Sequence, residues 1–202
     1  MILYLETNGI LELALRQERV ADTERLVELA KAGNIALAVP AIALAESYYP
    51  LRERMQWFEQ YQRMTQEAVS AMGRSQAEAY TKIAAAGSEV ETQLVAILTQ
   101  ERGSLEQSIL SLIDLAESIP LSADIIQSSI NLSAAIGLTE FDAMICASVI
   151  NHANGEPDAR KAFLSYDEDL LRNGRRELRH AGIDLFSDAE QCLAYAQRFA
   201  AE

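Results

Sequence analysis

Short apolar runs alternate with longer segments of helical composition along this chain. The first run, at 2–5, is continuous rather than alternating, as is typical of a strand buried on both faces of a parallel sheet. Further strand-like runs lie at 35–39, 162–166 and 183–186. Strands that alternate with helices in this way predict an α/β fold with a parallel sheet flanked by helices.

Capping residues and glycines give the expected helix limits. Asp22 or Thr23 is a candidate N-cap for one helix, and Gly137 is a candidate C-cap for another. A further helix that carries Asp142 follows Thr139. The remaining expected helices lie at 9–16, 21–32, 41–49, 122–135 and from Ser187-Asp188 to about Arg198.

The segment 52–118 differs in composition from the rest of the chain. It is rich in Gln, Glu, Ala, Leu and Met, with apolar residues at helical spacing, and Gly73, Gly87 and Gly103 are its glycine breakers. We expect two or three long helices, forming an antiparallel hairpin. The 202 residues then form a single domain, 1–202, in which 52–118 is a long helical insertion.

Charge and cysteine content narrow the classes of function. The net charge is −13, with 30 acidic and 17 basic residues, whereas a non-specific nucleic-acid binder is expected to be basic. Any nucleic-acid role therefore needs a local basic patch or metal ions that offset the acids. Cys146 and Cys192 form no CxxC pair, which fits a reduced cytoplasmic setting. With no basic leader and no 18-residue apolar stretch, we expect neither secretion nor membrane insertion.

Four acids occur where elements begin or end. Glu6 follows the first expected strand and Asp167 the third, while Glu46 lies about two turns into the helix after the second strand. Asp142 lies near the start of its own helix, with Thr139 three residues before it. Because the carboxyl ends of parallel strands share one edge of a sheet, the four side chains are expected to converge there.

Such a cluster favours a hard divalent cation. Carboxylates a few ångströms apart raise one another's pKa unless a cation compensates them, and Mg²⁺ or Mn²⁺ prefers oxygen ligands. One or two such ions can activate water and orient a phosphodiester. The pattern therefore indicates hydrolytic phosphoryl chemistry without a nucleophilic side chain.

Four segments, in this order, resemble the PIN-domain nucleases, especially the small VapC-type toxins. The segments are Leu5-Glu6-Thr7-Asn8, Val39 to Glu46, Gly137 to Ala147, and Phe163 to Leu170. The resemblance covers about 1–50 and 110–190. It implies a Rossmann-like parallel sheet and metal-dependent cleavage of RNA by Glu6, Glu46, Asp142 and Asp167. It also implies support from Thr7 or Asn8, a homodimer, and an antitoxin partner if the chain is a toxin.

One departure from the family pattern keeps an alternative open. The family's first acid is normally Asp, and Glu6 moves the carboxylate by roughly 1.5 Å. Because Mg²⁺ demands near-ideal geometry, activity is expected to be weakened, shifted toward Mn²⁺ or absent. The alternative is a catalytically weak or inactive PIN-like module that binds protein or RNA. A third reading is a structural helical adaptor whose acids are all caps.

Other polar residues have both functional and structural interpretations. Asp142 could interact with its helix dipole, and Asp167 and Asp169 could be caps; Asp169 is kept as a supporting residue beside Thr139. An arginine set is spaced to form one basic stripe for RNA phosphates if a continuous helix runs through Gly174. The competing interpretation is surface pairing with neighbouring acids. The set comprises Arg172, Arg175, Arg176 and Arg179.

Overall fold

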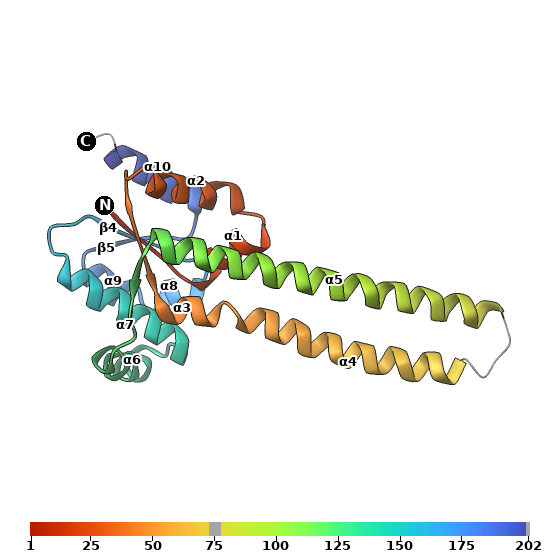
Figure 1. The fold of residues 1–202 in the computed structure, drawn as a ribbon. Helices are drawn as coiled ribbons and strands as arrows, with labels where there is room; N and C mark the ends of the chain where they lie inside the picture. The colour runs from red at the N-terminus through yellow and green to blue at the C-terminus, as the bar shows by residue number, and fades with distance from the viewer. Residues whose placement is uncertain (73–77, 201–202) are drawn as a thin grey trace. The chain divides into compact units, whose positions relative to one another are not determined.

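The computed structural model describes residues 1–72 and 78–200 of the chain. These residues form two compact units (Figure 1). The sheet unit comprises Met1–Ser47 and Leu105–Glu202, and the hairpin unit comprises Tyr48–Ser104. Every acid of the expected site belongs to the sheet unit.

The sheet unit is built on five parallel strands within the described residues. Their order is β3-β2-β1-β4-β5, so β1 lies at the centre. Tyr4 of β1 is in register with Ala38 of β2 on one side and with Phe163 of β4 on the other. The predicted α/β fold with a parallel sheet is confirmed. The strands are β1 (Ile2–Leu5), β2 (Ala36–Pro40), β3 (Glu117–Ile119), β4 (Lys161–Leu164) and β5 (Ile183–Phe186).

Helices cover both faces of this sheet. Figure 1 shows α2 and α10 together on one side of the sheet, and α7 on the other with α6 packed against it. The helices of the sheet unit are α1 (Thr7–Leu15), α2 (Val20–Lys31), α3 (Ala41–Glu46), α6 (Ala123–Ile136), α7 (Glu140–Gly155), α8 (Glu168–Asn173), α9 (Arg175–His180) and α10 (Ala189–Ala200).

The core follows from this layering. Leu3, Tyr4 and Leu5 of β1 and Phe163 and Leu164 of β4 are all buried, because central strands are covered on both faces. This explains why the first run is continuous in apolar character. Both cysteines are free and buried.

Strand β3 corrects the sequence prediction. Residues 117 and 118 were expected to belong to the helical segment 52–118, but together with Ile119 they pair with β2 at the edge of the sheet. Glu117 and Ser118 are polar, and Ile119 alone supplies an apolar side chain. A three-residue edge strand with one apolar residue has no hydrophobic period that could reveal it.

Helix limits agree in part with the capping residues. Gly137 ends α6 with φ 72°, as predicted. The N-cap prediction of Asp22 or Thr23 is wrong, because α2 begins at Val20 after Arg19. The backbone N–H of Arg19 donates to Glu12 at 2.9 Å, and this contact holds the chain where α2 begins.

The hairpin unit consists of α4 (Tyr49–Met72) and the first part of α5 (Glu78–Leu115). An ion pair joins Arg54 to Glu101 at 2.6 Å, and Gln62 donates a hydrogen bond to Glu91. A residue further along α4 thus contacts a residue earlier in α5, so the two helices are antiparallel, as predicted.

The glycines of this segment do not all break it. Gly87 and Gly103 lie inside α5, although both were expected to be breakers, whereas Gly73 falls outside the described residues. Each interior glycine costs about 1 kcal/mol relative to alanine, which a 38-residue helix absorbs.

Among the described helices, none taken singly has the length and apolarity to span a membrane. Helices α6 and α7 reach that length and apolarity only when they are taken together, and a bend of 118° separates them.

Candidate functional site

The expected acids lie around the switch point of the sheet. From β1 the chain moves outward through β2 to β3, and it then crosses to β4 and β5 on the other side of β1. In open parallel sheets, ligands bind beyond the carboxyl ends of the strands where the order reverses in this way. Glu6 directly follows β1, and Asp167 follows β4 by three residues. The two acids therefore flank that point.

Glu6 links the ends of the two central strands. It is the N-cap of α1, and its Oε2 accepts a hydrogen bond from the backbone N–H of Asn8 at 2.8 Å. Its Oε1 accepts from the backbone N–H of Tyr166 at 3.3 Å. Only 2% of Glu6 is exposed, so its carboxylate depends on these donors. Asn8 contributes to the site through its backbone.

Glu46 approaches the same corner from β2. It is the last residue of α3, and its carboxylate accepts a hydrogen bond from the hydroxyl of Thr7, the residue after Glu6. Thr7 is buried and Glu46 half-buried, so this contact is partly shielded from water. Thr7 thus joins the acid at the end of α3 to the acid at the end of β1.

Asp142 lies in the first turn of α7. The hydroxyl of Thr139, the N-cap of that helix, accepts from the backbone N–H of Asp142 at 3.3 Å. The same hydroxyl donates to Asp142 Oδ2 at 2.6 Å. The carboxylate is therefore held at a helix N-terminus, where negative charge is favoured.

Asp167 is held by backbone on both sides. Its Oδ1 accepts from the N–H of Leu170 at 2.8 Å, so it caps α8, and its own N–H donates to Ser165 Oγ at 3.1 Å. Asp169 forms an exposed ion pair with Arg172 at 2.5 Å. Asp167 is the acid of this segment that the turn fixes toward the sheet edge.

Electrostatic coupling connects the four acids. Burial raises the pKa of Glu6 to about 7; its backbone hydrogen bonds oppose that rise, and the charges of Glu46 and Asp167 add to it. Burial likewise raises the pKa of Glu46, with further increases from Asp142 and Asp167 and an opposing effect of the Thr7 hydrogen bond. Asp167 therefore acts on carboxyls from two other elements.

The pKa of Asp142 completes this coupling. Burial has the largest effect and raises the pKa of Asp142. The hydrogen bond from Thr139 lowers this pKa, and the charges of Asp167 and Asp169 raise it. A carboxylate is destabilised by like charge only when the charges are near and poorly screened. Like-charge repulsion thus links Glu6, Glu46, Asp142 and Asp167 into one group, in which Asp167 acts on each of the other three.

This donor set suits a divalent cation in its chemistry. Among the described residues, no Lys, Arg or His forms an ion pair with any of the four acids. Uncompensated carboxylate oxygens are the ligands that Mg²⁺ and Mn²⁺ prefer. In the part of the chain that the structure describes, however, no three His, Cys, Asp or Glu side chains are arranged to hold a metal ion. Each carboxylate instead faces a local hydroxyl or N–H donor.

The arginine set does not form one continuous stripe. The helix is interrupted at Gly174, between α8 and α9. Arg172 pairs with Asp169, and Arg176 pairs with Glu177 at 3.2 Å. For these two arginines the structural interpretation, pairing with neighbouring acids, is the one observed.

Sequence reasoning missed two contributors to the site. Ser165 orients the turn that carries Asp167, and the backbone N–H of Tyr166 holds Glu6. A polar Ser directly after a buried apolar run is a visible sign of such a turn. The role of Tyr166 has no sequence sign, because its N–H donates to a residue 160 positions away.

The comparisons with known proteins add no family to this geometry. Neither the protein-family models nor the curated proteins yield a match to the chain.

Proposed function

We propose that this chain is a PIN-like endoribonuclease that depends on Mg²⁺ or Mn²⁺ and hydrolyses RNA phosphodiester bonds, acting in the cytoplasm as the toxin of a toxin–antitoxin pair. One observation carries the proposal: like-charge repulsion links four acids from four segments into one group at the switch point of a parallel sheet. Ligands of such sheets bind at that place.

The residues have distinct parts in this function. Glu46, Asp142 and Asp167 would hold one or two ions together with Glu6; such ions supply Lewis acidity and lower the pKa of a water. The hydrogen bond from Thr7 keeps Glu46 turned toward the first strand. Thr7 itself is held in position by its burial at the start of α1.

The arginines on the exposed side extend the proposal to the substrate. Arg175 and Arg179 would contact RNA phosphates, since they follow Asp167 directly in the chain and a net charge of −13 leaves few cations for that purpose. Arg172 and Arg176, held by their ion pairs, would contribute less.

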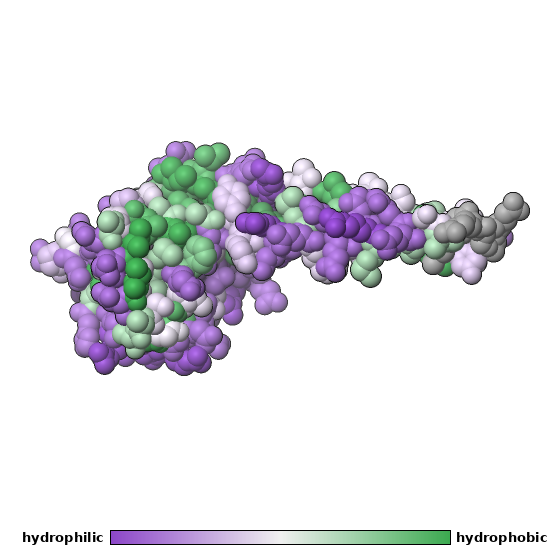
Figure 2. Space-filling view, turned by 90° about the horizontal axis from the view of Figure 1, so that it is seen from below, coloured by the Kyte–Doolittle hydropathy of each residue, from purple (hydrophilic) through white to green (hydrophobic). Residues whose placement is uncertain are grey.

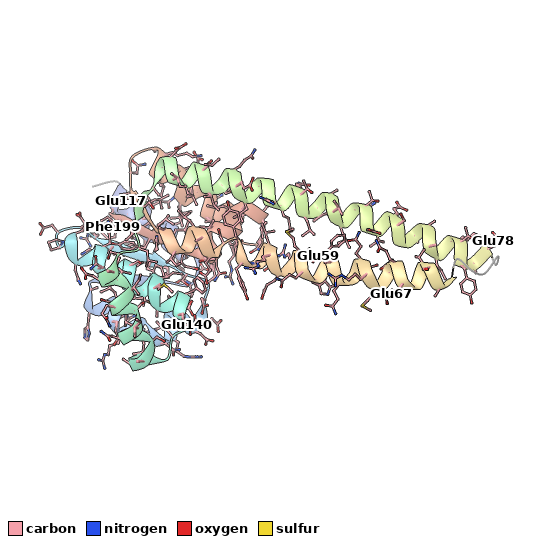
Figure 3. The ribbon with its side chains drawn as sticks, turned by 60° about the horizontal axis from the view of Figure 1, so that its bottom comes forward. Glu59, Glu67, Glu78, Glu117, Glu140 and Phe199 are labelled. Carbon is pink, nitrogen blue, oxygen red and sulfur yellow. The ribbon has the colours of Figure 1, made fainter. Side chains whose placement is uncertain are left out.

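The test compares two acids in the first turn of α7. Folded protein is incubated at high concentration with RNA and Mn²⁺ or Mg²⁺, alongside Asp142→Asn and Glu140→Gln. Glu140, labelled in Figure 3, is exposed and serves as the matched control. We expect cleavage by the parent and by Glu140→Gln, and a loss of at least about 100-fold for Asp142→Asn, because a reactive water needs its ions positioned. Intact RNA in every reaction would remove the enzymatic function.

A second candidate function is a PIN-like module that binds RNA or protein with weak or no catalysis. Its support is the contact pattern of Glu6, since both carboxylate oxygens already accept backbone hydrogen bonds. Glu6→Asp separates the candidates, because it restores the family's usual acid. A gain in Mn²⁺ affinity and cleavage supports the nuclease. RNA binding in both forms without cleavage supports the module.

A further inference from the structure

The hairpin unit carries more apolar surface than its own packing uses. Among the described residues, ten of the sixteen exposed large hydrophobic side chains lie in Tyr48–Ser104, about a quarter of the chain. Trp57 is 60% exposed and Met64 64%. Figure 2 shows apolar groups interspersed among polar ones along these helices. Scattered apolar side chains need no partner, so the deciding point is whether these side chains line up on one surface.

The exposed apolar residues follow a heptad spacing. On α4 apolar residues recur at intervals of four and three, at Trp57, Tyr61, Met64, Ala68 and Ala71, and all of them except the half-buried Tyr61 are exposed. On α5 the same intervals give Ile83, Ala86, Val90 and Ile97, with Gln93 in the row. A repeat of seven keeps one row of side chains facing a neighbouring helix.

This row is distinct from the seam inside the hairpin. Phe58 of α4 is buried, and Gly87 approaches Thr65 so closely that an added Cβ would lie 3.2 Å from the methyl group. Those residues lie between the two helices. The exposed row on each helix is turned by roughly 100° from that seam. Each helix therefore has one row for its partner in the hairpin and a second row that the hairpin leaves uncovered.

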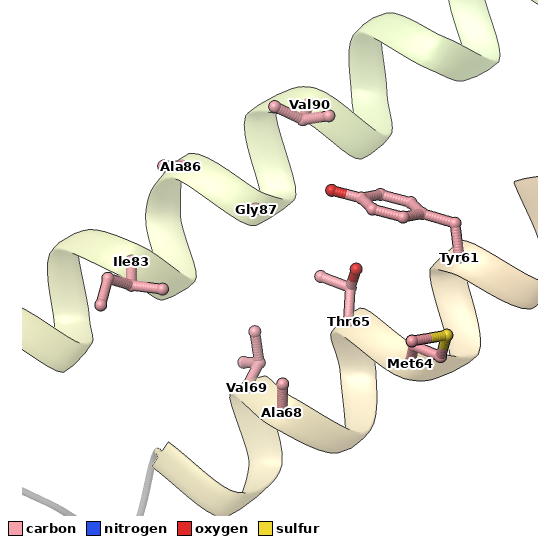
Figure 4. Close-up of a pocket in the computed structure, with 9 residues that line it drawn as sticks. All are labelled: Tyr61, Met64, Thr65, Ala68, Val69, Ile83, Ala86, Gly87 and Val90. Atoms are coloured by element: carbon pink, nitrogen blue, oxygen red, sulfur yellow. The ribbon is translucent and has the colours of Figure 1, made fainter.

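The middle parts of both exposed rows line one groove, together with residues of the seam. It has a volume of about 490 Å³, and Figure 4 shows that its walls come from α4 and α5. The lining residues are Tyr61, Met64, Thr65, Ala68, Val69, Ile83, Ala86, Gly87 and Val90. The two rows are thus on one side of the hairpin and form one apolar surface.

We propose that this surface binds the same surface of a second copy of the chain, so that two hairpins form a four-helix bundle. Rows with heptad spacing require a helical partner, and the second copy presents the same two rows. Charge favours this occupant as well. Residues 48–104 contain seven acidic and six basic residues, whereas the rest of the chain contains 23 and 11. The hairpin is the near-neutral part through which two strongly acidic molecules approach with least repulsion.

The exposed area is sufficient for a specific contact. Trp57, Met64, Ile83 and Ile97 are each at least half exposed, and Val90 is 45% exposed. At roughly 100 Å² for each of these side chains, the pair of hairpins would bury about 1,000 Å², the lower bound for a specific interface. An interface at this lower bound predicts a reversible dimer whose population depends on protein concentration.

Two valines on α5 give a matched test with the full chain. Val90 lies in the exposed row and is 45% exposed, while Val95 is 47% exposed and lies about 140° further round α5 by helix geometry, outside that row. Sedimentation velocity over a concentration series measures the dimer dissociation constant of the parent, Val90→Glu and Val95→Glu. We expect Val90→Glu to raise that constant at least about 100-fold, because the dimer would bury unpaired carboxylates, and Val95→Glu to leave it unchanged.

The outcomes are decisive in both directions. A monomeric parent at high micromolar concentration overturns the proposal, as does equal dimerisation of the two valine variants. If Val90→Glu does not fold, as circular dichroism would reveal, Met64→Glu and its control Met55→Glu decide in the same way, because Met55 is also exposed but lies about 180° round α4 from Met64. RNA cleavage enters none of these measurements, so the result is independent of the proposed nuclease activity.

Discussion

The buried carboxyl of Glu6 should make the sheet unit less stable as the pH rises. Burial raises its pKa in the folded chain from 4.5 to about 7. Below pH 4.5 the carboxyl is protonated in the folded and unfolded chains alike. Between 4.5 and about 7 the unfolded chain releases the proton while the folded chain retains it, so stability falls across this window and stays low above it.

The size of the loss follows from the pKa difference. A rise from 4.5 to about 7 corresponds to about 3 kcal/mol of folding free energy. Glu6→Gln removes the titration and keeps an acceptor for the N–H of Asn8. Its amide group would face the N–H of Tyr166, donor against donor, at a cost of about 1 kcal/mol. Above the window we therefore expect the variant to be more stable than the parent by about 2 kcal/mol.

Urea unfolding in the presence of EDTA measures this difference. Because the isoelectric point is about 4.6, the measurements run from about pH 5.5 to about pH 8. At about pH 5.5 the parent and the variant should be nearly equal in stability. Trp57 belongs to the hairpin unit, so its fluorescence follows that unit separately from the circular dichroism of the whole chain. Glu140→Gln, which removes an exposed carboxylate, should keep the parent's pH dependence. The reasoning is refuted if Glu6→Gln shows the same pH dependence of stability as the parent.

Three other perturbations have defined outcomes. Gly174→Ala should destabilise the sheet unit by about 1–3 kcal/mol, since its Cβ would lie 2.9 Å from Cys146 Sγ, and adding Cys146→Ala should return part of that loss in urea unfolding. His152→Ala should cost about 2 kcal/mol, because it removes the partner at 2.9 Å from the buried hydroxyl of Tyr4; a smaller cost in a Tyr4→Phe background would verify this. Mn²⁺ should raise the melting temperature more at about pH 8 than at about pH 6, since Glu6 must lose its proton to bind; equal shifts would contradict its role as a ligand.

The central part of the fold could be predicted because its physics is local in sequence. β1 lies at the centre of a sheet covered on both faces, and Leu3, Tyr4 and Leu5 leave no polar position to confuse the pattern. The position of an acid after such a run then predicts the sheet edge at which it lies. Glu6 and Asp167 could be placed at one edge by this reasoning alone.

Other features depend on contacts that sequence spacing does not contain. Strand β3 exists because β2 offers a free edge to 117–119, and that choice is made by tertiary packing rather than by apolar period. The place of Gly87 within α5 also depends on tertiary packing. Helix α4 passes so close to Gly87 that a Cβ there would crowd Thr65.

Glu6 has two competing uses, and its length decides between them. A shorter Asp would be a good N-cap for α1, but its carboxylate would be withdrawn by roughly 1.5 Å from the N–H of Tyr166, which already donates at 3.3 Å. The extra methylene thus lets one carboxylate tie β1 to the turn after β4. The same contacts use one lone pair of each oxygen, so a cation at Glu6 must share the carboxylate with two backbone donors and compete with a proton. An Asp at this position would give up the link between the strands and leave an oxygen open. Compared with the Asp of the PIN-domain nucleases that this segment resembles, Glu6 strengthens the link between the strands and adds competition for the carboxylate oxygens that a cation would use.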